Sequence, residues 1–177
     1  MRLPDVPTQI AQGLYRLLLQ TKLTVERWGN ARKYFFAYDA AGGLTLPTSW
    51  VDIEFDTMEI IDRSLFSHAN GVVTISEDCR VLVDCEVTAE ATNIIRHYAA
   101  WRLSKDVGNG FSEVPGSRVY TYHRNGTIPY GSASIRMLLD VRAGTKIKLQ
   151  GKSTHATEVE TTANTCRMSI RRVINGD

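Results

Sequence analysis

The most regular pattern in the chain is an alternation of apolar and polar residues between Tyr130 and Gln150. Apolar side chains occupy alternate positions on both sides of the segment Ala143–Thr145, and arginine and lysine side chains lie between them. Successive residues of a strand point to opposite faces of a sheet, so this pattern predicts extended strands with one buried face. Two such strands joined by a glycine turn predict an antiparallel hairpin.

The same alternation continues through the chain from about Trp50 onward, and Cys79–Thr88 shows it most clearly. Asn70–Gly71 is typical of a tight hairpin turn. Segments 105–117 and 151–163 are rich in small and polar residues, and we expect them to be loops. A succession of short strands without helical periodicity excludes a βαβ fold and predicts an all-β antiparallel sandwich, either a jelly roll or an immunoglobulin-like fold.

Residues 1–45 differ from the rest of the chain. Thr8 favours a helix N-cap, and the apolar residues that follow it recur at helical spacing. Tyr34–Tyr38 is an aromatic segment that suits a short strand or a docking segment, and Gly42–Gly43 is typical of a linker. The pattern therefore predicts an N-terminal helical arm and linker over residues 1–45 and a β domain over 46–177.

The apolar stripe of the predicted arm packs either on the protein's own body or on another chain. A single short helix is marginally stable alone, so it needs one of these partners. We expect the stripe to attach the protein to a larger assembly. The predicted attachment residues are Ile10, Leu14, Leu17 and Leu18.

Composition narrows the function classes. The 177 residues include 21 basic and 19 acidic side chains, a formal net charge of +2, which gives no reason to expect nucleic acid as a partner. No apolar run approaches the roughly 20 residues of a membrane span, so we expect no membrane partner. The N-terminus lacks the apolar block of a secretory signal, and we expect the protein to be made in a cytoplasm.

The three cysteines, Cys79, Cys85 and Cys166, lie within alternating strand patterns. Cys79 and Cys85 would be roughly 20 Å apart in an extended strand, too far for a disulfide between them. We expect three reduced, small apolar side chains, although a bridge from Cys166 to one of the others stays open.

Four segments, in order, resemble one family. These are the strand Val51–Asp56, the hairpin region Phe66–Ile75, the long alternating segment Ser134–Leu149 and the closing strand Cys166–Val173. Together they resemble the tumour-necrosis-factor-like (TNF-like) jelly roll, a family that includes complement globular heads and bacteriophage virion proteins. The resemblance covers residues 50–174 and implies a jelly-roll homotrimer with a structural or binding role.

The chain departs from that family at two points. Cys79–Arg80 stands where the family often has glycine and tyrosine, and Thr145 stands where it usually has aspartate. Calcium sites of the family are therefore not carried over to this chain.

No catalytic or metal-binding motif is evident, so we expect neither an enzyme nor a cofactor. The four histidines are far apart in sequence and include no H-x-H pair, and we expect His97 to be a core or interface residue. Glu158 and Glu160 lie in a polar segment, where we expect them to be solvated. The sequence thus predicts no metal site.

We therefore expect a trimeric structural protein of a bacteriophage particle: a capsid decoration or cement protein, a head fibre or a short tail appendage. It would be located in the virion and contact other virion proteins, such as the major capsid or tail protein. The alternative is a carbohydrate- or receptor-binding adhesion module of a phage fibre that binds a glycan on the host surface. The predicted trimer-interface residues, too apolar for solvent on outward-facing positions, are Tyr98, Tyr120, Tyr122 and Leu138.

Overall fold

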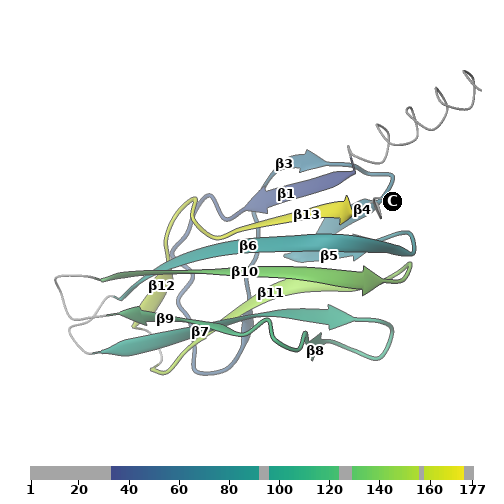
Figure 1. The fold of residues 1–177 in the computed structure, drawn as a ribbon. Helices are drawn as coiled ribbons and strands as arrows, with labels where there is room; N and C mark the ends of the chain where they lie inside the picture. The colour runs from purple at the N-terminus through teal and green to yellow at the C-terminus, as the bar shows by residue number, and fades with distance from the viewer. Residues whose placement is uncertain (1–32, 92–95, 124–128, 156–157, 174–177) are drawn as a thin grey trace, which may run out of the picture. The chain divides into compact units, whose positions relative to one another are not determined.

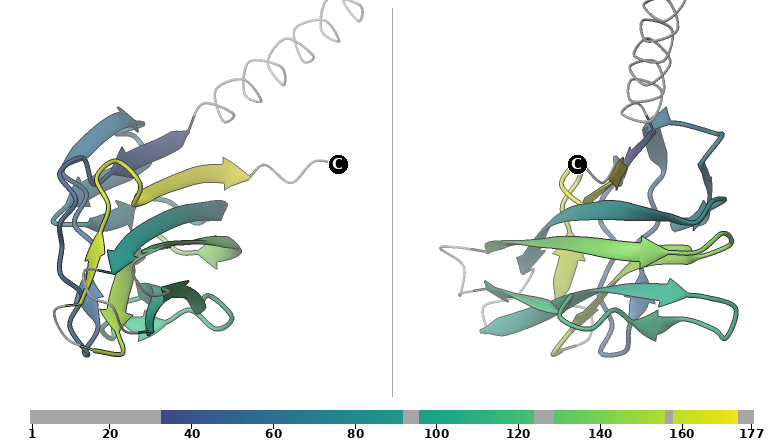
Figure 2. Two further views of the ribbon diagram at one scale, coloured as in Figure 1. Left: turned by 90° about the vertical axis from the view of Figure 1, so that its left-hand side faces the viewer. Right: turned by 45° about the vertical axis from the view of Figure 1, so that its right-hand side comes forward.

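The computed structural model describes residues 33–91, 96–123, 129–155 and 158–173, which belong to one compact unit, Lys33–Val173. They form two antiparallel sheets packed face to face (Figure 1; Figure 2). The predicted all-β antiparallel sandwich is confirmed. None of the described residues forms a helix of the length and hydrophobicity needed to cross a bilayer.

The first sheet has the strand order β10-β6-β13-β1-β3, and β12 pairs with β6. The long strand β6 pairs with the edge strand β10 on one side and with β13 and β12 on the other. The strands of this sheet are β1 (Tyr34–Tyr38), β3 (Thr57–Ile61), β6 (Cys79–Ala91), β10 (Tyr130–Val141), β12 (Val159–Thr161) and β13 (Arg167–Val173).

The second sheet has the order β4-β5-β11-β7-β8, with β2 on β11 and β9 on β7. The predicted turn at Asn70–Gly71 joins β4 to β5, and both residues have positive φ (50° and 72°), as a two-residue hairpin turn requires. The strands of this sheet are β2 (Val51–Asp52), β4 (Phe66–Ala69), β5 (Val72–Ile75), β7 (His97–Asp106), β8 (Ser112–Glu113), β9 (Val119–His123) and β11 (Lys146–Ser153).

The core lies between the two sheets and follows the alternation of the sequence. On β6 the side chains of Val81, Val83 and Cys85 are fully buried, and their neighbours face outward. Trp101 on β7 is the largest fully buried side chain. Its indole Nε1 donates to Thr121 Oγ1 at 3.2 Å, which satisfies the polar atom that burial would otherwise leave without a partner.

The predicted hairpin between Ile135 and Leu149 is wrong. β10 pairs with β6 in the first sheet, whereas β11 pairs with β7, β5 and β2 in the second. The turn at Ala143–Thr145 therefore carries the chain from one sheet to the other. Both strands alternate because each buries one face in the shared core, and alternation does not reveal the pairing partner.

The strand β1 lies within the range that the sequence assigned to the arm. It pairs with β13 and β3, and Phe35 and Ala37 on it are fully buried. Of the two readings of Tyr34–Tyr38, the strand is the one observed, and the compact unit begins at Lys33 rather than after residue 45. The predicted attachment residues Ile10, Leu14, Leu17 and Leu18 lie outside the described residues.

The two segments expected to be loops contain strands. Residues 105–117 include β8, which pairs with β7. Residues 151–163 include the end of β11 and all of β12. These strands are short and rich in polar residues, so they lack a long apolar alternation, and their pairing depends on neighbours that are distant in sequence.

Candidate binding surface

Three exposed tyrosines lie together on the outer face of the second sheet. Tyr98 on β7 is directly opposite Tyr122 on β9, and the centroids of their rings are 4.8 Å apart. Tyr120 lies two residues along β9, opposite Ala100. The exposed fractions are 50% for Tyr98, 60% for Tyr120 and 38% for Tyr122. We call these three residues the tyrosine surface.

The fourth predicted interface residue, Leu138, lies on the other sheet. It is on β10, is 53% exposed and faces outward. β9 and β10 are the adjoining strands of the two sheets and contact each other. They approach closely at Gly131, where an added Cβ would lie 2.9 Å from His123 Cε1. The sequence thus grouped residues that share an edge of the sandwich but belong to two faces.

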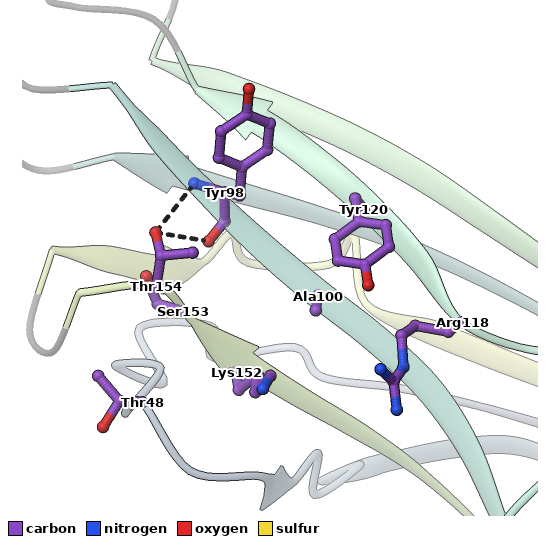
Figure 3. A pocket seen from close by; sticks show the side chains of 8 residues that line it. All are labelled: Thr48, Tyr98, Ala100, Arg118, Tyr120, Lys152, Ser153 and Thr154. Carbon is purple, nitrogen blue, oxygen red and sulfur yellow. Dashed lines mark hydrogen bonds between the residues drawn. The ribbon is translucent and has the colours of Figure 1, made fainter.

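A shallow pocket of about 280 Å³ lies beside the tyrosine surface (Figure 3). Tyr98 and Tyr120 form part of its lining. Thr154, another lining residue, is tied to β7, because its backbone N–H donates to the carbonyl oxygen of Tyr98 at 2.9 Å. The lining residues are Thr48, Tyr98, Ala100, Arg118, Tyr120, Lys152, Ser153 and Thr154.

Three basic side chains surround the half-buried Trp50, and two of them, Arg118 and Lys152, also line this pocket. The guanidinium carbon of Arg102 lies 4.1 Å from the ring centroid of Trp50, Lys152 Nζ lies 5.0 Å away and the guanidinium carbon of Arg118 5.5 Å away. Cations at such distances are attracted by the electron-rich face of an indole. Trp50 therefore holds three basic groups close together despite their mutual repulsion.

One carboxylate offsets part of this positive charge. Glu113 accepts hydrogen bonds from both Arg118 and Arg102, and the pair with Arg118 keeps the pKa of Glu113 below its usual value. Across the described ranges, no carboxylate lies within ion-pair distance of Lys152. Three basic groups and one acidic group leave a local excess of positive charge beside the exposed tyrosine rings.

Sequence reasoning found the tyrosines but not Trp50, Arg118 or Lys152. Lys152 lies in a segment that was expected to be a loop, although the alternation of β11 continues through it to Ser153. Extending that alternation by three residues would have placed Lys152 on the outer face. Nothing local in the sequence indicates that Trp50 packs against Arg102, since the two are far apart along the chain.

Two of the histidines lie close together, although they are far apart in the sequence. His97 is fully buried, and its Nδ1 lies 3.2 Å from Nδ1 of His155. Glu158 was expected to be solvated but is half-buried, with Oε2 3.0 Å from His97 Nε2. Within the described part of the chain, these three form a group whose ligand atoms are close enough to hold a metal ion.

His123, which is opposite His97 in the strand register, has a structural role. Its Nδ1 lies 2.8 Å from the carbonyl oxygen of Pro129, and its Nε2 lies 2.9 Å from Thr121 Oγ1. Burial lowers the pKa of His123, which favours the neutral ring. Thr121 Oγ1 also accepts a hydrogen bond from the indole N–H of Trp101. Thr121 and His123 are therefore part of a buried hydrogen-bond network, and the Thr121 hydroxyl is not an accessible nucleophile.

Solved structures of other proteins share this fold. Eiger TNF from S. frugiperda is 10% identical, with a TM-score of 0.59 over 81% of this chain and 94% of that chain. Murine APRIL is 6% identical, with a TM-score of 0.58 over 79% and 98%. The globular domain of zebrafish complement 1qA is 10% identical, with a TM-score of 0.57 over 81% and 99%.

The described body is therefore a TNF-like jelly roll. No protein-family model matches the chain, and no curated protein sequence matches it either. At these identities the similarity establishes the fold, and what the protein does must be argued from its own residues.

Proposed function

We propose that this chain is a non-enzymatic, homotrimeric structural protein of a bacteriophage particle. The observation that carries the homotrimer is the tyrosine surface, because a TNF-like body that exposes neighbouring aromatic rings beside a sheet edge has an apolar face suited to a partner. The phage particle is proposed from the resemblance of four sequence segments to a family that includes virion proteins. A second copy of the same chain is the partner that closed rotational symmetry provides without any further protein.

In this proposal the edge formed by β9 and β10 contacts the neighbouring protomer. The exposed side chains at this edge, Tyr120, Tyr122 and Leu138, supply apolar area, and Tyr98 extends it along β7. Aromatic residues are enriched at protein interfaces because they bury a large area at a small cost in side-chain entropy. The basic groups around Trp50 lie at the rim and set the orientation of the protomers.

The residues before Lys33 attach the trimer to the particle. The stripe of Ile10, Leu14, Leu17 and Leu18 has the spacing of a helix that binds in an apolar groove. Three copies carried by one trimer bind together, so contacts that are weak singly become firm through effective concentration. The protein is made in the host cytoplasm and is incorporated into the virion as a decoration protein, head fibre or tail appendage.

The experiment measures oligomeric state and particle binding in parallel. We expect analytical ultracentrifugation of the full chain to show a trimer at micromolar concentration. Tyr120→Glu should dissociate it, because the substitution places a charge in the buried centre of the interface. Phe111→Glu is the matched control, since Phe111 is an exposed aromatic residue away from the tyrosine surface. A monomeric wild-type protein would refute the trimer.

Removal of residues 1–32 tests the attachment. The remaining chain keeps every described strand, so it should fold and trimerise but lose binding to particles. A truncated protein that still binds particles normally would assign attachment to the jelly roll instead. A truncated protein that unfolds would show that the first 32 residues contribute to the fold of the body.

A second function is favoured by the pocket beside the tyrosine surface. Tyrosine rings next to Arg118 and Lys152 suit a sugar that carries an acidic group, so the alternative is a carbohydrate- or receptor-binding adhesion module. Arg118→Ala distinguishes the two functions when glycan-array binding and sedimentation are measured together. Loss of binding to acidic glycans with an intact trimer would support adhesion, and unchanged array binding would exclude it at this pocket.

A further inference from the structure

Three side chains with metal-binding atoms meet where the chain crosses from one sheet to the other. His97 is the first residue of β7, His155 follows the end of β11, and Glu158 directly precedes β12. β7 and β11 belong to the second sheet, whereas β12 pairs with β6 in the first. The cluster thus joins segments of both sheets, and its members come together only in the folded chain.

The distances within the cluster match those of metal ligands. The two Nδ1 atoms of His97 and His155 are 3.2 Å apart. Two ligand atoms at about 2.0–2.1 Å from a tetrahedral zinc ion are about 3.3 Å apart. One ligand atom from each of the three residues lies within 4.8 Å of the other two. Small rotations of the side chains would therefore bring all three atoms to bonding distance of one ion.

The burial of the three residues suits a site that binds an ion from solution. His97 is fully buried and held in the first position of a strand, so it serves as a fixed ligand. His155 is exposed and Glu158 is half-buried, so these two side chains can move toward an ion and leave it an entry path.

The hydrogen bonding around His97 indicates that a cation belongs beside it. Its Nδ1 faces Nδ1 of His155, which donates or accepts according to its tautomer, and its Nε2 faces the carboxylate of Glu158, which only accepts. The contact between Nε2 and Glu158 is short, at 3.0 Å, but it lacks hydrogen-bond alignment, and Nε2 is buried. Buried polar atoms are nearly always satisfied, and an ion bound through one ring nitrogen of His97 would leave the other nitrogen protonated, as a hydrogen-bond donor to its neighbour.

We propose that His97, His155 and Glu158 bind a divalent transition-metal ion, with zinc as the best fit. Two imidazoles and one carboxylate form a donor set that suits zinc, and three protein ligands leave one position for water or for a group from another molecule. His123 is not a ligand, because both of its ring nitrogens are already engaged. The bound ion links the start of β7 to the start of β12 and so ties the two sheets together.

The test uses the full chain stripped of metal with a chelator and dialysed against Zn²⁺ or Co²⁺. We expect one ion per chain, visible absorption from tetrahedral Co²⁺, and a higher melting temperature with Zn²⁺ in excess. His155→Ala and Glu158→Gln should each weaken zinc binding by roughly 100-fold or more and remove the thermal shift. Both residues lie at the margin of the cluster, so the variants should fold.

Glu160→Gln is the matched control, because Glu160 lies two residues further along, on β12, and its carboxylate accepts a hydrogen bond from the Thr45 hydroxyl. It should bind zinc as the wild type does. The proposal is overturned if the wild type binds no zinc, or if His155→Ala and Glu158→Gln bind it as tightly as the wild type. It is also overturned if the control loses binding equally, since the ion would then be held by surface charge in general.

Discussion

Gly151→Ala tests how the floor of the pocket is built. Gly151 on β11 is directly opposite Trp101 on β7, and both are buried. A Cβ added to Gly151 would lie 2.9 Å from Cζ3 and 3.0 Å from Cε3 of the indole, and 3.1 Å from Cδ2 of Leu46. The adjacent residues Ala100 and Lys152 line the pocket on the outer face. Gly151 is therefore required by the close approach of the indole.

The expected cost follows from two opposing effects. Adding a methyl group to a well-packed core typically costs about 1–3 kcal/mol, because the neighbours must leave their preferred positions. Replacing glycine stabilises the protein by about 0.4–1 kcal/mol, because the unfolded chain loses freedom. The net loss should be about 1–2 kcal/mol, which lowers the melting temperature of a domain of this size by about 3–6 °C.

Thermal unfolding followed by circular dichroism measures this loss, and a double-mutant cycle identifies its cause. In a Trp101→Leu background the indole is absent, so Gly151→Ala should cost less than in the wild type by at least about 0.5 kcal/mol. A melting temperature that is unchanged or raised by Gly151→Ala would refute the reasoning. An equal cost in both backgrounds would show that the strain comes from elsewhere.

Two further predictions concern titration and thiol reactivity. Burial lowers the pKa of His68, so the unfolded chain binds more protons than the folded chain once the pH falls below about 6.5, and stability falls with it. His68→Phe should reduce the loss of stability between pH 7.5 and 5.5 by up to about 1.4 kcal/mol, measured by urea unfolding; an equal loss in the variant would contradict this. Burial raises the pKa of Cys85 strongly and that of Cys166 to about 12, so both thiols should resist a thiol reagent in the native protein, whereas all three cysteines should react in denaturant. A disulfide found by mass spectrometry in freshly purified protein would contradict that expectation.

The sequence by itself predicted the class of the fold and the direction in which most side chains point. The alternation in β6 predicted the buried face of that strand, and the position of Asn70–Gly71 predicted a hairpin turn. The outward orientation of Tyr98, Tyr120 and Tyr122 was also predicted. These features depend on residues that are neighbours along the chain, because the period of a strand and the φ angles of a turn are local properties.

Only the tertiary structure decided which strands pair and which side chains meet. The sequence could not show that β10 and β11 belong to different sheets, because an alternating strand looks the same beside any partner. It also could not show that Arg102 and Lys152 lie over the ring of Trp50, or that His97 contacts His155, 58 residues further along. Such contacts follow from the long-range packing of two sheets around one core, which brings together residues that no local pattern connects.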